Sequence, residues 1–210
     1  MKYLTLILFV FTFSCTTNSP ANEKSLGQRI DTVKIYLEKN QRGIVAPLYN
    51  TIKRTEILLG LTSLEQGSDS MELRIWRHRI MNSGHSVLIL NYENKKWNAK
   101  EYLYSLTIDT IGDEKLAFKE ANVIEPRNGW SPVLRNISNL GLEKLSDTIP
   151  APSNIGLMDE GIVYGIEIST KNIYIFKTRI LDELDMPLLK DDKLVPLIKL
   201  FNSEFNPERW

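Results

Sequence analysis

The stretch Met71–Ile108 constrains the fold more than any other part of the chain, because it has the pattern of three consecutive β-strands. Asn82-Ser83-Gly84 separates the first strand from the second with residues that tolerate turn geometry. Val87–Leu90 is an apolar run too short for a typical helix, which indicates a strand covered on both faces. Glu93–Lys96 then forms a polar hairpin loop before the third strand. We therefore expect this meander to form the centre of a sheet.

The first strand, 71–80, has two unlike faces. Leu73 and Ile75 share one face, and Arg74, Trp76 and His78 share the other. Leu73 and Ile75 have no polar group, so we expect theirs to be the core face. Arg74 and His78 are costly to bury without partners, so we expect the opposite face to be at least partly open. A large aromatic ring beside positive charge suits a ligand-binding surface, and these three residues are the candidate ligand-binding site. The competing expectation is that a helix covers Trp76 and that the arginines extend to its edges.

The remaining pattern predicts a single α+β domain over 25–210, with a mainly antiparallel sheet and a few packed helices. Gly161–Thr178 has the alternation and central turn of a second hairpin, and 115–124 favours a further strand. Apolar residues at helical spacing predict helices at 26–39, 131–140 and 192–203. Residues 44–66 fit helix and strand equally well, and the pattern leaves them open.

The N-terminus has the features of a targeting segment. Leu4–Phe13 is apolar except for two threonines, follows the positive Lys2 and is too short to span a bilayer, so we expect 1–14 to be a signal peptide. Cys15 follows the small Ser14 and is the only cysteine of the chain, which excludes an intramolecular disulfide. The segment resembles a bacterial lipoprotein signal, and this likeness implies that Cys15 is lipidated. Residues 15–24 would then form the lipidated end and a flexible tether. The alternative is an ordinary secretory signal with an incidental cysteine.

Three stretches carry a broader resemblance: RTEILLGLTSLEQGSDSMELRIWRH at 54–78, NGW-S-P-V-L at 128–134 and GIVYGIEISTKNIYIF at 161–176. They are similar to uncharacterised lipoproteins of the Bacteroidota, and the likeness covers most of the chain after the signal. It implies one α+β domain on a lipid anchor in the cell envelope, at the outer membrane. It brings no activity, ligand or catalytic residue with it.

The charged and histidine residues exclude several functions. Lysine and arginine number 26 and aspartate and glutamate 26, so no overall positive field recruits nucleic acid. His78 and His85 could meet across paired strands, but no third ligand is near them in the sequence, and protein zinc sites use three or four. We therefore expect no metal, and the absence of phosphate-binding motifs predicts no cofactor.

Catalytic chemistry has few candidates. A catalytic triad could be drawn from Ser68 or Ser70 with Asp69 and the later His78. We do not favour it, because serine and aspartate are ordinary loop residues. Glu167 lies within an apolar strand, where we expect it to face solvent or to pair with a base on the next strand. Acidic residues at 182–192 lack the spacing of a calcium loop.

The sequence thus favours a cell-envelope lipoprotein that acts as a binding module, held to the membrane by its lipid, with an envelope protein or a glycan as its partner. The alternatives are a small envelope hydrolase and a structural subunit of an envelope complex.

Overall fold

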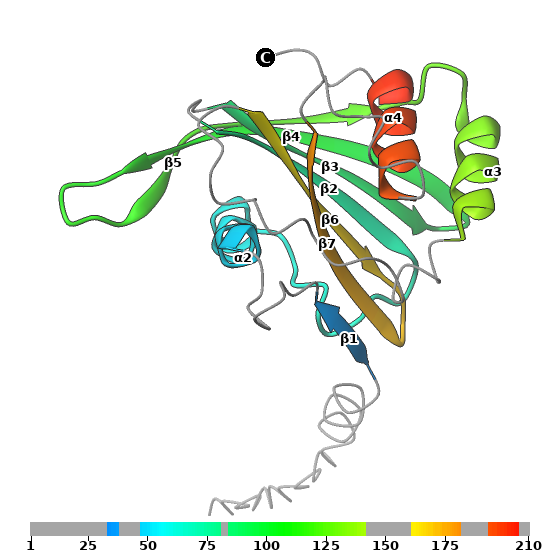
Figure 1. Ribbon diagram of the computed structural model, residues 1–210, viewed down its shortest axis with the longest axis horizontal. Coiled ribbons are helices and arrows are strands. Elements are labelled where there is room, and N and C mark those ends of the chain that lie inside the picture. Colours follow the sequence, from blue (N-terminus) through cyan, green and yellow to red (C-terminus); the bar gives the residue numbers. More distant parts are fainter. Residues whose placement is uncertain (1–32, 38–46, 81–83, 142–160, 182–192, 206–210) are drawn as a thin grey trace, which may run out of the picture.

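The computed structural model describes residues 33–37, 47–80, 84–141, 161–181 and 193–205, which form one α+β domain. Seven strands in this part of the chain make one sheet (Figure 1): β1 Lys34–Leu37, β2 Glu72–Ile80, β3 Gly84–Glu93, β4 Lys96–Ile108, β5 Glu114–Ile124, β6 Gly161–Ser169 and β7 Ile173–Leu181. The helices described are α2 Pro47–Leu59, α3 Trp130–Leu140 and α4 Leu194–Phe205. None of the helices in these ranges is long and apolar enough to cross a bilayer.

Strand β2 is the centre of the sheet, whose order is β1-β7-β6-β2-β3-β4-β5. It pairs antiparallel with β3 on one side and with β6 on the other. Among the strands of the described residues, only the β1–β7 pair is parallel. The prediction of a mainly antiparallel sheet with 71–108 at its centre is therefore confirmed, and so is the hairpin that β6 and β7 form.

The β3–β4 hairpin is closed by the two residues Asn94 and Lys95, with φ angles of 53° and 62°. Positive φ at both central residues is the geometry that matches the twist of the flanking strands. Asn tolerates this conformation well, whereas a lysine adopts it at some cost. The turn fixes the register of β3 against β4, in which Asn91 pairs with Asn98.

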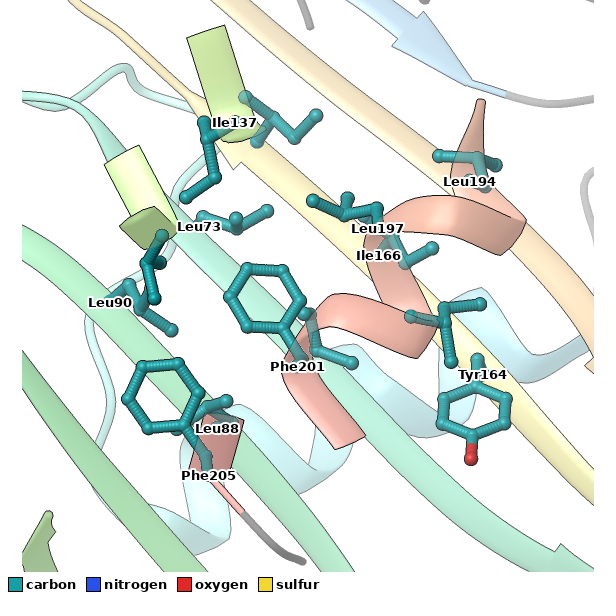
Figure 2. Packing of buried hydrophobic residues seen from close by; sticks show 14 of the residues in the cluster. Leu73, Leu88, Leu90, Ile137, Tyr164, Ile166, Leu194, Leu197, Phe201 and Phe205 are labelled. Carbon is teal, nitrogen blue, oxygen red and sulfur yellow. The ribbon is translucent and has the colours of Figure 1, made fainter. Parts of the chain in front are cut away.

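One face of the sheet packs against α3 and α4, and this layer holds the larger apolar core. Figure 2 shows the rings of Phe201 and Phe205 pointing from α4 toward the leucines of β2 and β3. Leu73 is 1% exposed and Ile75 5% exposed, so their side is a core face, as the alternation predicts. Pro196 lies in the first turn of α4, where its missing N–H is tolerated, and Gly141 ends α3 in the left-handed conformation.

The other face of the sheet is covered by α2 (Figure 1), which packs over a second apolar cluster that includes Trp76, Tyr174 and Phe176. Gly165 of β6 makes this close approach feasible, because a Cβ atom there would clash with Cδ1 of Ile52 in α2. The sheet is therefore sandwiched between helices rather than open on one side.

Two sequence expectations change, and one assignment that the sequence left open is now made. Residues 34–37 were expected within a helix over 26–39, but they form β1, whose backbone groups pair with β7; 26–32 and 38–39 lie outside the described residues. Tertiary pairing overrides the helical spacing there, since four residues carry little helical preference of their own. The ambiguous segment 44–66 contains α2. Helix α3 starts at Trp130, one residue before the expected Ser131, with Gly129 as its cap and no side-chain cap hydrogen bond.

Candidate functional site

The three residues predicted to bind a ligand lie on β2, and their side chains are buried on the face that α2 covers. Trp76 is 0% exposed, Arg74 2% and His78 8%. The expectation that their face is partly open is therefore wrong, and the competing expectation that a helix covers Trp76 is confirmed. Alternation places side chains on one face of a strand, but it carries no information about a second layer that covers that face. The cost of burying Arg74 is met by partners, as the following contacts show.

The carboxylate of Glu167 lies at the middle of this buried face and is 0% exposed. Its Oε2 accepts a hydrogen bond from Nε1 of Trp76 at 2.6 Å. Its Oε1 accepts from the hydroxyl of Tyr174 at 2.6 Å and from Nζ of Lys53 at 2.7 Å. The expectation that Glu167 faces solvent or pairs with a base on the next strand is wrong, because its cation comes from α2, on the second layer.

Arg74 joins the same network from the next position on its face. Its Nε donates to Glu72 at 2.7 Å, one terminal nitrogen donates to Glu56 at 2.7 Å, and the other donates to the carbonyl of Thr62 at 2.7 Å. Lys53 closes the network by bridging Glu56, at 3.0 Å, to Glu167. Charged side chains of α2 are thus hydrogen-bonded to β2 and β6, which fixes the helix on the sheet.

Burial sets the proton affinities in this network. The pKa of Glu56 is raised from 4.5 to about 7, mainly by burial and further by the charge of Glu167, while Lys53 and Arg74 oppose the rise. Burial first, and the charge of Glu167 second, raise the pKa of Tyr174 far above its ordinary value, so its hydroxyl stays protonated and donates. Glu56 can therefore exchange a proton near neutral pH.

The two histidines meet as the sequence suggests. His78 and His85 are cross-strand partners, with ring centroids 4.6 Å apart, and the hydroxyl of Tyr104 lies 3.1 Å from Nε2 of His78. Burial, and secondarily His85, lower the pKa of His78 to about 3; burial also lowers the pKa of His85. Both rings are thus neutral at physiological pH. Among the residues described, no group of three or more His, Cys, Asp or Glu could hold a metal ion.

The remaining sequence candidates do not converge. Ser68 bonds through its backbone to Thr170, beyond the start of β2, whereas His78 lies six residues into that strand. At about 3.3 Å per residue the two are roughly 20 Å apart, so no triad forms. Cys15, the signal 1–14, the tether 15–24 and the acidic stretch 182–192 all lie outside the described residues.

Two hollows that the sequence did not reveal lie on opposite faces of the sheet. The first has a volume of about 490 Å³ and lies between α3 and the sheet. Its lining is mostly apolar and includes Trp97, Leu134, Ile137, Ile168, Ile173 and Ile175. Ser138 and Thr170 supply the only hydroxyl groups among its described lining residues, and none of these carries a titratable side chain. This apolar hollow is suited to a neutral ligand.

The second hollow, of about 440 Å³, lies beside α2 on the face that carries Arg74. The lining residues with charged or amide side chains are Glu72, Arg74, Asn91, Glu93, Asn98 and Lys100. Of the predicted ligand-binding residues, Arg74 lines the second hollow, whereas Trp76 and His78 line neither of these two. Helix–sheet packing creates both hollows, and a row of polar residues near strand ends is the sequence signal of the second one only.

Comparisons with known proteins find no relative of this chain: no protein-family model matches it, no curated protein is significantly similar, and no solved structure matches. What the domain can bind therefore follows from its own residues and their geometry.

Proposed function

We propose that this chain is a cell-envelope lipoprotein whose folded domain binds a small, neutral, mainly apolar molecule in the hollow between α3 and the sheet. The observation that carries this proposal is the hollow itself, about 490 Å³ in volume and lined mostly by apolar side chains. Ligand sites of proteins are typically 300–1,000 Å³ hollows of this composition, with a few polar groups that orient the ligand.

The lining defines the class of ligand. Ile137, Ile168 and Ile175 offer apolar contact, and Trp97 adds a large aromatic surface. The hydroxyl groups of Ser138 and Thr170 can orient one polar atom of the ligand. A charged group would find no counter-ion among the described lining residues and would lose its hydration there. An acyl chain or a neutral ring compound fits these conditions.

The N-terminus supports the envelope location. The apolar segment Leu4–Phe13 followed by Ser14-Cys15 is the pattern of a lipoprotein signal. A lipidated Cys15 would hold the domain at a bacterial membrane, and we place it at the outer membrane. Apolar molecules are concentrated in such a membrane. The membrane is then the first partner, and an envelope protein or glycan a second. We prefer this reading to a hydrolase or a structural subunit because the hollow provides a site for a ligand, whereas no specific observation favours the other two.

Photo-crosslinking tests the proposal with the full chain reconstituted in lipid nanodiscs. A neutral alkyl diazirine is the probe, and mass spectrometry maps the labelled peptides. We expect labelling within 134–141 and 168–175. Ser138→Phe places a ring in the hollow and should reduce this labelling at least several-fold. Asn139→Phe is the matched control, because Asn139 is exposed on the same helix and does not line the hollow. Equal labelling of the two variants, or labelling confined to other segments, would refute an apolar binding site here.

A further inference from the structure

The hollow on the opposite face, beside α2, has a different chemistry. It is bounded by Thr62, which follows α2, and its floor is formed by β2, β3 and β4. The side chains of Glu72, Asn91 and Asn98 share this face, because Asn91 is the cross-strand partner of both others. The site is therefore built at one end of the paired strands β2, β3 and β4, which hold its polar groups at fixed spacings.

Arg74 is the most ordered polar group of this hollow. Its side chain is only 3% exposed, and it is fixed by Glu56, Glu72 and the carbonyl of Thr62. A guanidinium group carries five N–H bonds, and three of them are used in these contacts. Within the described residues, one N–H on each terminal nitrogen has no acceptor. Two donors of a nearly buried group thus remain for a ligand.

The charges of the hollow balance. Glu72 and Glu93 contribute two negative charges, and Arg74 and Lys100 contribute two positive ones. The charge of Arg74 is already shared by two carboxylates, and that of Lys100 lies 4.8 Å from the centre of the Tyr102 ring. An anion or a cation would therefore gain little here over its hydration in water.

The amides of Asn91 and Asn98 define what a neutral ligand must offer. Each amide has two donor hydrogens and an acceptor oxygen. The Asn91 side chain makes no hydrogen bond within the described part of the chain, and Asn98 makes only a long one of 3.5 Å to the carbonyl of Lys96. Hydroxyl groups, which both donate and accept, match such amides. Ile89, Tyr102 and the 79% exposed Val123 add apolar surface for C–H groups.

We propose that the hollow formed by Arg74, Asn91, Asn98 and their neighbours is a second binding site, which takes a neutral saccharide. It is independent of the apolar hollow, which lies on the other face of the sheet. A sugar ring carries hydroxyl groups around its edge for the amides and the Arg74 donors, and C–H groups for the apolar lining. A domain with both sites could hold a glycan on one face and an apolar molecule on the other.

Saturation-transfer NMR on the full chain in nanodiscs tests this site without a sugar-based detergent. The neutral probes are N,N′-diacetylchitobiose and cellobiose, and the charged probes are glucuronic acid and glucosamine. We expect saturation transfer at millimolar concentration to at least one neutral probe, with weaker transfer to both charged ones. The double variant Asn91→Ala/Asn98→Ala should weaken this binding about tenfold, as the loss of one or two ligand hydrogen bonds implies.

The control is Asn136→Ala, which removes an exposed amide from α3 on the other face of the sheet and should leave saccharide binding unchanged. Circular dichroism establishes that each variant is folded. No transfer to either neutral probe, stronger binding of a charged probe, or an equal effect of the Asn91/Asn98 and Asn136 variants would each overturn the proposal. None of these outcomes affects the photo-crosslinking of the apolar hollow, so the two proposed binding sites are tested independently.

Discussion

The indole nitrogen of Trp76 donates a hydrogen bond to the carboxylate of Glu167, 2.6 Å away, and neither side chain is exposed. This bond joins two neighbouring strands, β2 and β6. Lys53 of α2 donates a further hydrogen bond to the same carboxylate. A buried carboxylate is tolerated only while its acceptor positions are filled. The same contacts therefore hold the helix on the sheet and make the burial of Glu167 feasible.

The first prediction tests this bond. Trp76→Phe keeps an aromatic ring but removes the donor, so one oxygen of a buried carboxylate loses its partner. We expect the free energy of unfolding to fall by about 2–3 kcal/mol, from the lost hydrogen bond and the smaller ring. Urea denaturation measures it. Trp130→Phe is the matched control, because Trp130 donates the same type of bond, 2.7 Å, to Glu125 at the surface. A loss as large for Trp130→Phe would show that burial of the bond is not the cause.

The second prediction concerns pH. The pKa of Glu56 in the folded protein, about 7, lies above the ordinary value of 4.5, so the folded state binds this proton more tightly than the unfolded state. The stability it contributes is fully present below pH 4.5 and is lost as the pH rises through 7. The size of the effect is about 3 kcal/mol, at 1.36 kcal/mol per pH unit.

Glu56→Gln isolates this effect, because glutamine cannot ionise. The difference in free energy of unfolding, wild type minus Glu56→Gln, should decrease steadily between pH 4.5 and about pH 8. His78 has the opposite dependence: its lowered pKa costs stability as the pH falls below 6.5. Since both proteins contain His78, its contribution cancels in the difference. Parallel stability curves for the two proteins would mean that Glu56 has an ordinary pKa.

The third prediction concerns the anchor. Cys15→Ser removes the thiol that a lipoprotein signal requires for acylation. The resemblance to such signals implies three acyl chains, more than the two signals that make anchoring stable. We expect the variant to leave the membrane fraction or to keep its signal peptide. Membrane fractionation and the mass of the N-terminal peptide measure this. Unchanged fractionation and mass would favour the alternative of an ordinary secretory signal.

The strands were predictable because their signal is local. Alternation in 71–80 and the turn at Asn94-Lys95 specify strand, face and register within a few residues. The position of α2 was not predictable from the same signals. Its contact with Gly165 depends on residues more than a hundred positions apart. The apolar run Val87–Leu90 indicates that both faces are covered, but it does not identify the element that covers Trp76. The prediction of an open ligand-binding face was wrong for this reason. Arg74 can be buried because it pairs with Glu56, and only the folded chain brings these two residues together.

The fourth prediction concerns α4, whose apolar spacing the sequence does reveal. Phe201 is 2% exposed and points toward β2 and β3 (Figure 2). Phe201→Ala should lower the free energy of unfolding by about 3–5 kcal/mol, because it removes buried apolar surface and leaves a cavity that the helix and sheet cannot fully close. Leu200→Ala on the same helix is the control: Leu200 is only partly buried, so its loss should be clearly smaller. Urea denaturation of both variants decides the matter. A loss below about 1 kcal/mol for Phe201→Ala would mean that α4 contributes little to the core.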